Sequence, residues 1–194
     1  MSLQELQLIL LQVILTAAYR RVFGQPWRET ARLLALGCVF GAAAQFSLGP
    51  EVNRYSPNIT LYVSYVSVAV VLMWGMTLTG VYRIHVWLAR RLRRRPDFAV
   101  FLAVALPILV LVELFGSHVF HVKLDHYERF APLLSAMNAM HAPPWLYASY
   151  TPFVLAFYLA LRKLRWLPGE PDARAEAALE VAVAVTYFYG ATWI

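Results

Sequence analysis

Long apolar segments alternate with short polar gaps along the chain, and the basic residues are concentrated in every second gap. Three gaps, at residues 20–32, 83–95 and 162–174, contain fourteen of the seventeen lysine and arginine residues. Loops beside membrane-spanning helices keep lysine and arginine on the cytoplasmic side of the membrane. The alternation therefore predicts a polytopic membrane protein, and it predicts the orientation of that protein as well.

The composition supports the same class of protein. Of the 194 residues, 60% are hydrophobic and 14% are charged, whereas about 25% are charged in soluble domains. No polar stretch is long enough to fold separately, so we expect a single transmembrane domain over residues 1–194. The net charge of +6 lies at the ends of the apolar segments, which favours contact with anionic membrane lipids over binding to nucleic acid.

Six segments have about the length that a bilayer core requires of a helix. They cover residues 3–19, 33–48, 59–82, 98–121, 145–161 and 177–194. The predicted fold is thus an all-α membrane bundle of about six transmembrane helices, with both termini extracytoplasmic because the basic gaps face the cytoplasm. The excess of arginine over lysine is typical of a GC-rich bacterial genome, so the predicted location is the bacterial inner membrane.

Two of these segments have distinctive sequences. The first segment is the weakest of the six, because four polar residues interrupt it: Gln4, Glu5, Gln7 and Gln12. The second contains Gly37 and Gly41 followed by three alanines. Small residues at helical spacing allow two membrane helices to approach closely.

A short internal similarity indicates a repeat. The matching segments are Arg54–Pro57 followed by Leu61–Tyr65, and Arg129–Pro132 followed by Leu146–Tyr150. Each pair lies in an outer loop and at the start of the next helix. The pattern predicts a parallel repeat relating residues 33–82 to residues 98–161 by an axis along the membrane normal. The alternative is that similar interfacial chemistry recurs independently.

Glu113 is the candidate catalytic residue. It lies in the fourth segment, roughly 5 Å outward of the bilayer midplane at a rise of 1.5 Å per residue. A carboxylate at this depth costs several kcal/mol unless it is neutral, paired or facing a wet cavity, which makes a functional role the default hypothesis. The alternative is a structural carboxyl group that is hydrogen-bonded to a neighbour such as Gln45 or Ser117.

Four of the five histidines fall between residues 118 and 141, close in sequence to Glu113. His118, His121 and His141 are the candidate metal ligands, because imidazole together with carboxylate suits zinc, iron or copper. The possible cofactor is therefore a divalent metal of open identity. No HExxH motif or cysteine pair accompanies these histidines, so the alternative is that they bind lipid headgroups or loop backbone.

These observations lead to two functional hypotheses. The first is a small membrane enzyme or binder with a polar site near the outer leaflet that takes a lipophilic molecule. Its candidate substrate-binding residues are Gln45, Tyr62, Asn138 and Tyr147. The second is a non-catalytic accessory or assembly subunit, with other membrane subunits as its partners. Whether the protein is an enzyme stays open at this point.

Overall fold

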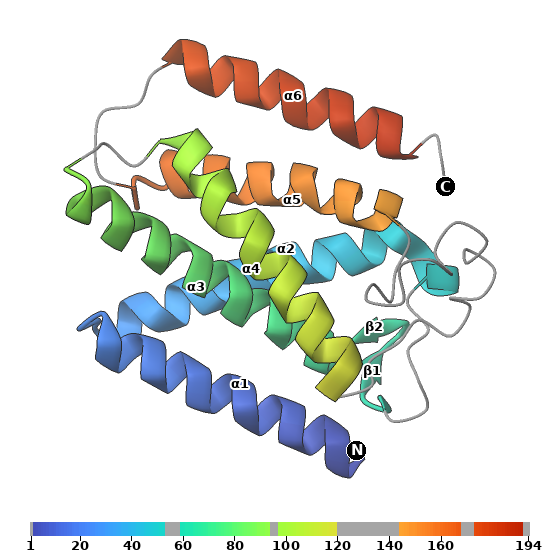
Figure 1. Ribbon diagram of the computed structural model, residues 1–194. Coiled ribbons are helices and arrows are strands. Elements are labelled where there is room, and N and C mark those ends of the chain that lie inside the picture. The colour runs from blue at the N-terminus through green and yellow to red at the C-terminus, as the bar shows by residue number, and fades with distance from the viewer. Residues whose placement is uncertain (1, 53–58, 94–96, 120–143, 168–172, 192–194) are drawn as a thin grey trace.

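The computed structural model describes residues 2–52, 59–93, 97–119, 144–167 and 173–191, which form a helical bundle with one small hairpin (Figure 1). Its elements are α1 (Leu3–Val22), α2 (Trp27–Val52), β1 (Tyr62–Val63), β2 (Val66–Ser67), α3 (Val68–Arg91), α4 (Phe98–Val119), α5 (Pro144–Lys163) and α6 (Ala173–Ala191). The predicted all-α bundle is confirmed for these residues, and the described helices correspond one to one with the six apolar segments.

Successive helices run in opposite directions, with α3 at the centre of the bundle. Helix α3 packs against α1, α2 and α4, whereas α5 contacts α2, α4 and α6. The helix ends that flank the basic gaps therefore gather at one end of the bundle, on the left in Figure 1, and the hairpin and both termini lie at the other end. We call the first of these the basic end.

Among the described residues, one helix is long and apolar enough to cross a membrane by its length and composition. This helix is α3, and most of its apolar stretch is buried inside the bundle. It begins nine residues later than the predicted span 59–82 and ends nine residues later. Both differences have a physical cause.

The late start of α3 follows from the hairpin that precedes it. Strands β1 and β2 pair in antiparallel register, with Tyr62 opposite Ser67 and Val63 opposite Val66. Ser64 has a φ of 59° in the two-residue turn between them, a left-handed conformation that interrupts a helix. The Ser67 hydroxyl then caps α3 by accepting a hydrogen bond from the Val70 amide, as N-cap serines do.

The late end of α3 follows from the absence of a helix-breaking residue in Arg83–Arg91. The charge at Arg83 marks the end of the predicted apolar segment, but arginine has a high helix propensity, so the helix continues through it. The helix ends where the Leu92 amide donates to the carbonyl of Leu88 and Arg93 adopts a φ of 52°. One consequence is that Arg83 and His85 lie within the helix and face its neighbours.

Helices α2 and α3 pack closely through the predicted small-residue face. A Cβ atom at Gly37 would lie 2.9 Å from both the Cα atom and the carbonyl oxygen of Gly75. At Gly41 a Cβ atom would lie 2.4 Å from the Cβ atom of Trp74. The two backbones approach at a distance that only glycine permits.

Helix α1 has a polar inner face and an apolar outer face. Glu5, Gln12 and Thr16 are buried against the bundle. Leu8 is buried with them. Most of the large exposed side chains of the same helix are apolar, namely Leu3, Leu6, Leu10, Val13, Ile14 and Val22, whereas Gln7 and Arg21 are the exposed polar ones. This arrangement is the reverse of the usual one for a surface helix in water, in which the apolar stripe faces the core.

The two copies of the proposed repeat differ in local structure. Tyr62 lies in strand β1, whereas Tyr147 lies within helix α5. The loop motifs that begin at Arg54 and Arg129 lie outside the described residues. The superposition of residues 33–82 on residues 98–161 stays a prediction, and the two tyrosine motifs themselves have different backbone conformations.

Candidate functional site

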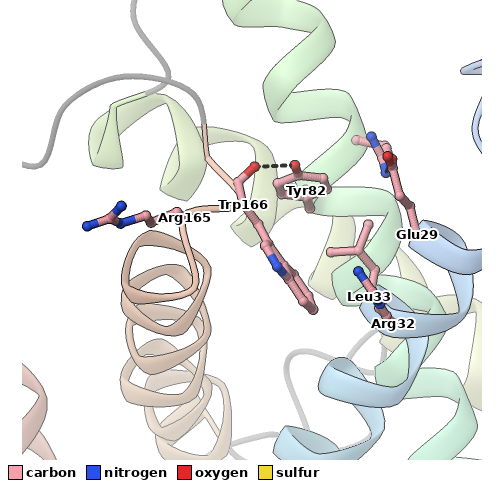
Figure 2. A pocket seen from close by; sticks show the side chains of 7 residues that line it. Glu29, Arg32, Leu33, Tyr82, Arg165 and Trp166 are labelled. Atoms are coloured by element: carbon pink, nitrogen blue, oxygen red, sulfur yellow. Dashed lines mark hydrogen bonds and ion pairs between the residues drawn. The ribbon is translucent and has the colours of Figure 1, made fainter.

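The described part of the chain contains a cavity at the basic end of the bundle, between α2, α3 and the segment that follows α5 (Figure 2). Its volume is about 280 Å³, and its lining residues are Glu29, Arg32, Leu33, Tyr82, Arg83, Arg165 and Trp166. The volume is just below the range of about 300–1,000 Å³ that is typical of small-molecule sites.

Three parts of the chain contribute the residues that line this cavity. Glu29, Arg32 and Leu33 are three and four residues apart on α2, so they share one face of the helix. Tyr82 and Arg83 come from α3. Arg165 has a φ of 55°, and this left-handed residue ends the chain's helical path after α5.

A hydrogen bond fixes the wall that the segment after α5 forms. The Tyr82 hydroxyl donates to the carbonyl oxygen of Trp166 at 2.7 Å, as Figure 2 shows. The Trp166 amide in turn donates to the carbonyl of Leu161 at 2.9 Å. These bonds tie the end of α5 to α3 and hold the indole of Trp166 along the cavity.

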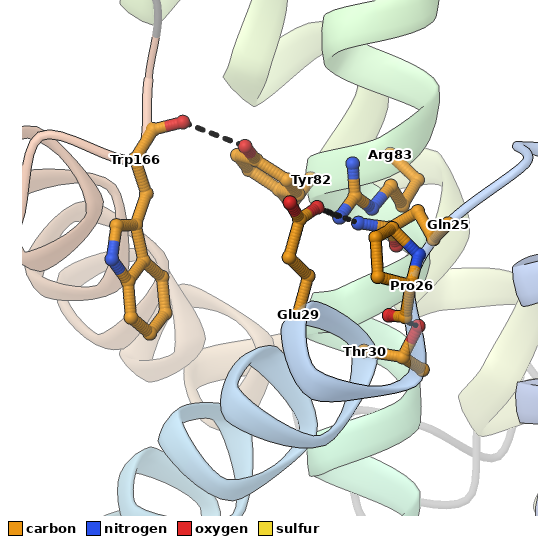
Figure 3. A network of polar contacts seen from close by, with 7 residues as sticks. All are labelled: Gln25, Pro26, Glu29, Thr30, Tyr82, Arg83 and Trp166. Atoms are coloured by element: carbon orange, nitrogen blue, oxygen red, sulfur yellow. Dashed lines mark hydrogen bonds and ion pairs between the residues drawn. The ribbon is translucent and has the colours of Figure 1, made fainter.

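A polar network joins the start of α2 to α3 on the opposite side of the cavity (Figure 3). The Gln25 side-chain amide donates to the Glu29 carboxylate at 2.9 Å. The Arg83 guanidinium approaches the same carboxylate oxygen at 3.5 Å and lies 4.8 Å from the centre of the Tyr82 ring. One carboxylate oxygen is thus shared between a neutral donor and a cation.

The balance of charge in the cavity is positive. The Arg83 side chain is 12% exposed, whereas that of Glu29 is 57% exposed, so the carboxylate is largely solvated. The Nε atom of Arg83 is buried without a hydrogen-bond partner among the described residues. Arg32 adds a second guanidinium to the lining, and Arg165 adds a third whose side chain points away from Arg32 in Figure 2. This arrangement can bind an anion through charge-assisted hydrogen bonds.

A second buried polar group lies near the basic end. His85 is fully buried, and its Nε2 atom lies 3.0 Å from the carbonyl oxygen of Asp97. Because a carbonyl only accepts, Nε2 carries the proton in this contact. The ring also packs edge-on against Phe101, so His85 links α3 to the start of α4.

Most of the site residues predicted from the sequence fall outside what the structure describes. Glu113 and His118 lie on α4, and Tyr147 lies on α5, but their side chains are outside the described set. His121, Asn138 and His141 lie outside the described residues altogether. The candidate metal and acid site therefore stays a prediction. Within the described part of the chain, no three histidine, cysteine, aspartate or glutamate side chains are grouped as metal ligands.

Two predicted ligand-binding residues are described. Gln45 is buried, and its side-chain oxygen accepts from the Ser67 amide at 2.9 Å while its amide donates to the Ser67 carbonyl at 3.4 Å. Tyr62 is half-buried in strand β1. In the structure Gln45 thus joins α2 to the hairpin, and its role toward a ligand stays a prediction.

The sequence does not indicate this cavity, because each of its residues matches a common pattern of membrane proteins. Arginines beside apolar segments indicate topology, and tryptophans at the same depth indicate an interfacial belt. The available signal was geometric, because an antiparallel bundle brings all three basic gaps to one end.

No family model, no curated protein and no solved structure matches this chain. The function is therefore argued from the fold and the cavity.

Proposed function

We propose that this chain is a six-helix membrane protein of the bacterial inner membrane that binds a lipophilic molecule carrying a polar group. The observation that carries the proposal is the reversed face of α1, where Glu5 and Gln12 are buried and large apolar side chains face outward. Exposed apolar side chains cost free energy in water and none in lipid, whereas buried polar groups need partners in either solvent.

The exposed side chains of other helices also favour a lipid environment. Exposed large apolar side chains also occur on α2, α4 and α6: Val39, Phe46, Leu106, Leu111, Phe115 and Val181. At the basic end, Trp27 and Trp87 are 55% and 52% exposed, as expected for aromatic anchors at a membrane interface. In the proposed orientation the basic end faces the cytoplasm and both termini lie outside.

The binding part of the proposal rests on the cavity. Leu33 and the Trp166 indole offer apolar contact, while Arg32 and Arg83 offer charge. A small-molecule site characteristically combines an apolar lining with a few placed polar groups. The outer-leaflet site, with Glu113 as the acid and His118, His121 and His141 as metal ligands, remains a separate part of the proposal.

Cysteine labelling tests the topology. In a Cys38→Ala background, which removes the chain's single cysteine, we expect Ser56→Cys to react with a membrane-impermeant maleimide added from the outside. Arg93→Cys should be protected until the membrane is permeabilised. The reverse pattern would show that the orientation is wrong, and labelling of both positions in sealed vesicles would argue against a membrane-spanning bundle.

Elemental analysis tests the outer-leaflet site. If that site binds a metal, we expect protein purified without chelators to contain a divalent metal at a fixed ratio, and His121→Ala to lose it. Glu113→Gln keeps the size of the side chain but removes the titratable proton, so it separates a ligand or acid from a structural carboxyl group. A metal-free wild-type protein would end the metal hypothesis. A second subunit that copurifies at a fixed ratio would favour the accessory-subunit hypothesis instead.

A further inference from the structure

We infer that the cavity at the basic end binds the phosphate group of an anionic lipid from the cytoplasmic leaflet. This inference rests on the proposed membrane location and adds the chemical class of the ligand. Four observations carry it: the charge of the cavity, the incomplete pairing of the Arg83 guanidinium, the size of the cavity and its depth.

The charge favours an anion. Arg32 and Arg83 line the cavity with one carboxylate, that of Glu29. Glu29 is already hydrogen-bonded to Gln25 and is more than half exposed, so it neutralises Arg83 only in part. A nearly buried guanidinium at 3.5 Å from a solvated carboxylate has lost much of its hydration without gaining a close ion pair.

The geometry of Arg83 favours an acceptor with several oxygens. Its Nη2 atom makes the long contact to Glu29, whereas its Nε atom has no partner among the described residues. The planar guanidinium presents donors in a fork that matches phosphate and carboxylate oxygens. A phosphate group in the cavity would add acceptors for the Arg83 guanidinium, which lines the cavity, and would have a second contact available at Arg32.

Size and depth favour a lipid headgroup over an entire lipid. A volume of about 280 Å³ holds a compact polar group but not two acyl chains, which would lie against the apolar exterior. Trp27 begins α2 and Trp87 lies near the end of α3, so both are at the basic end, and both are exposed. Interfacial tryptophans mark the level of the headgroups. Lysine and arginine at this level attract anionic lipids.

The experiment measures ligand binding to the full-length protein in a neutral detergent. The probes are short-chain dioctanoyl phosphatidylglycerol, dioctanoyl phosphatidylcholine and inorganic phosphate, and native mass spectrometry gives the occupancy of each. We expect the phosphatidylglycerol to bind about tenfold more tightly than the phosphatidylcholine, because both carry a phosphate but only the first is a net anion. Inorganic phosphate should bind more weakly than the phosphatidylglycerol because it gains no apolar contact.

Two variants on the same helix provide the comparison. Arg32→Gln removes an exposed cation that lines the cavity, and Arg28→Gln removes an exposed cation from α2 that does not line it. We expect Arg32→Gln to weaken binding of the phosphatidylglycerol by about tenfold and Arg28→Gln to change it by less than about twofold. Arg83→Gln should have an effect at least as large, and Arg32→Gln keeps the test valid if the buried variant does not fold.

Several outcomes would overturn the inference. Equal affinity of the wild-type protein for the two lipids would rule out an anion site, and equal losses in Arg32→Gln and Arg28→Gln would indicate general surface attraction. Inorganic phosphate binding as tightly as the phosphatidylglycerol would make the ligand a free phosphate rather than a lipid. Failure of the proposed function is distinguishable, because it would appear in the cysteine-labelling pattern of the membrane-embedded protein, whatever the lipid affinities are.

Discussion

Gly37→Val is expected to destabilise the bundle by about 3 kcal/mol or more, because the new side chain would have no space between α2 and α3. Its Cβ atom would lie 2.9 Å from the Cα atom and the carbonyl oxygen of Gly75. Both are backbone atoms, so relief requires the helices to separate along their whole contact. We expect a large fall in the midpoint of thermal unfolding, measured in detergent by size-exclusion chromatography of a fluorescent fusion.

The matched control is Ala35→Val on the same helix, where the alanine side chain is exposed. It adds a valine to the same helix without entering the contact, so it corrects for any effect of valine on helix formation. We expect the control to unfold close to the wild-type temperature. Equal stability of Gly37→Val and Ala35→Val would contradict the close packing of α2 on α3.

Glu5→Ala should be the second strongly destabilising change. The Glu5 carboxylate is fully buried and accepts from the Thr60 hydroxyl at 2.9 Å, the Thr60 amide at 3.2 Å and the Leu61 amide at 2.9 Å. A hydrogen bond to a charged group contributes about 1.5–3 kcal/mol, and its loss leaves a donor unsatisfied. We therefore expect a loss of several kcal/mol, with faster hydrogen exchange at the Thr60 and Leu61 amides.

Gln7→Ala is the control for this prediction, since Gln7 lies two residues away on α1 and is exposed. Glu5→Gln should give an intermediate result, because it keeps one carbonyl oxygen as an acceptor but introduces an amide that faces the same donors. If Glu5→Ala and Gln7→Ala unfold at the same temperature, the carboxylate does not anchor the segment at Thr60.

The helices were predictable because their signals are local. Long apolar segments separated by charged gaps indicate helices whichever partners they meet, and the six described helices overlap the predicted segments. The role of Gly37 was also predictable, since a glycine in an apolar helix has few other uses than close packing. The start of α3 was not predictable, because the left-handed turn that precedes it is at Ser64, and serine gives no strong turn signal.

The cavity could not be predicted, because it depends on where three distant segments meet. Arg32, Arg83 and Trp166 come from three different polar gaps, and each matches the common pattern of interfacial residues. The contact between the Tyr82 hydroxyl and the carbonyl of Trp166, separated by 84 residues in sequence, joins the end of α5 to α3, as does the packing of the His85 and Tyr158 rings. The polar face of α1 was noted in the sequence as a weakness of the first segment, whereas in the structure it is the face that packs.

The partners of that polar face have a consequence for the order of assembly. Glu5 bonds to Thr60 and Leu61, and Gln12 donates to the carbonyl of Ala69 at 3.1 Å. All of these partners are synthesised after α2. When only the first helix has been synthesised, the Glu5 carboxylate therefore lacks these hydrogen-bond donors and the Gln12 amide lacks this acceptor. The first helix of this protein can settle in its final position only after the chain has been made as far as the beginning of α3.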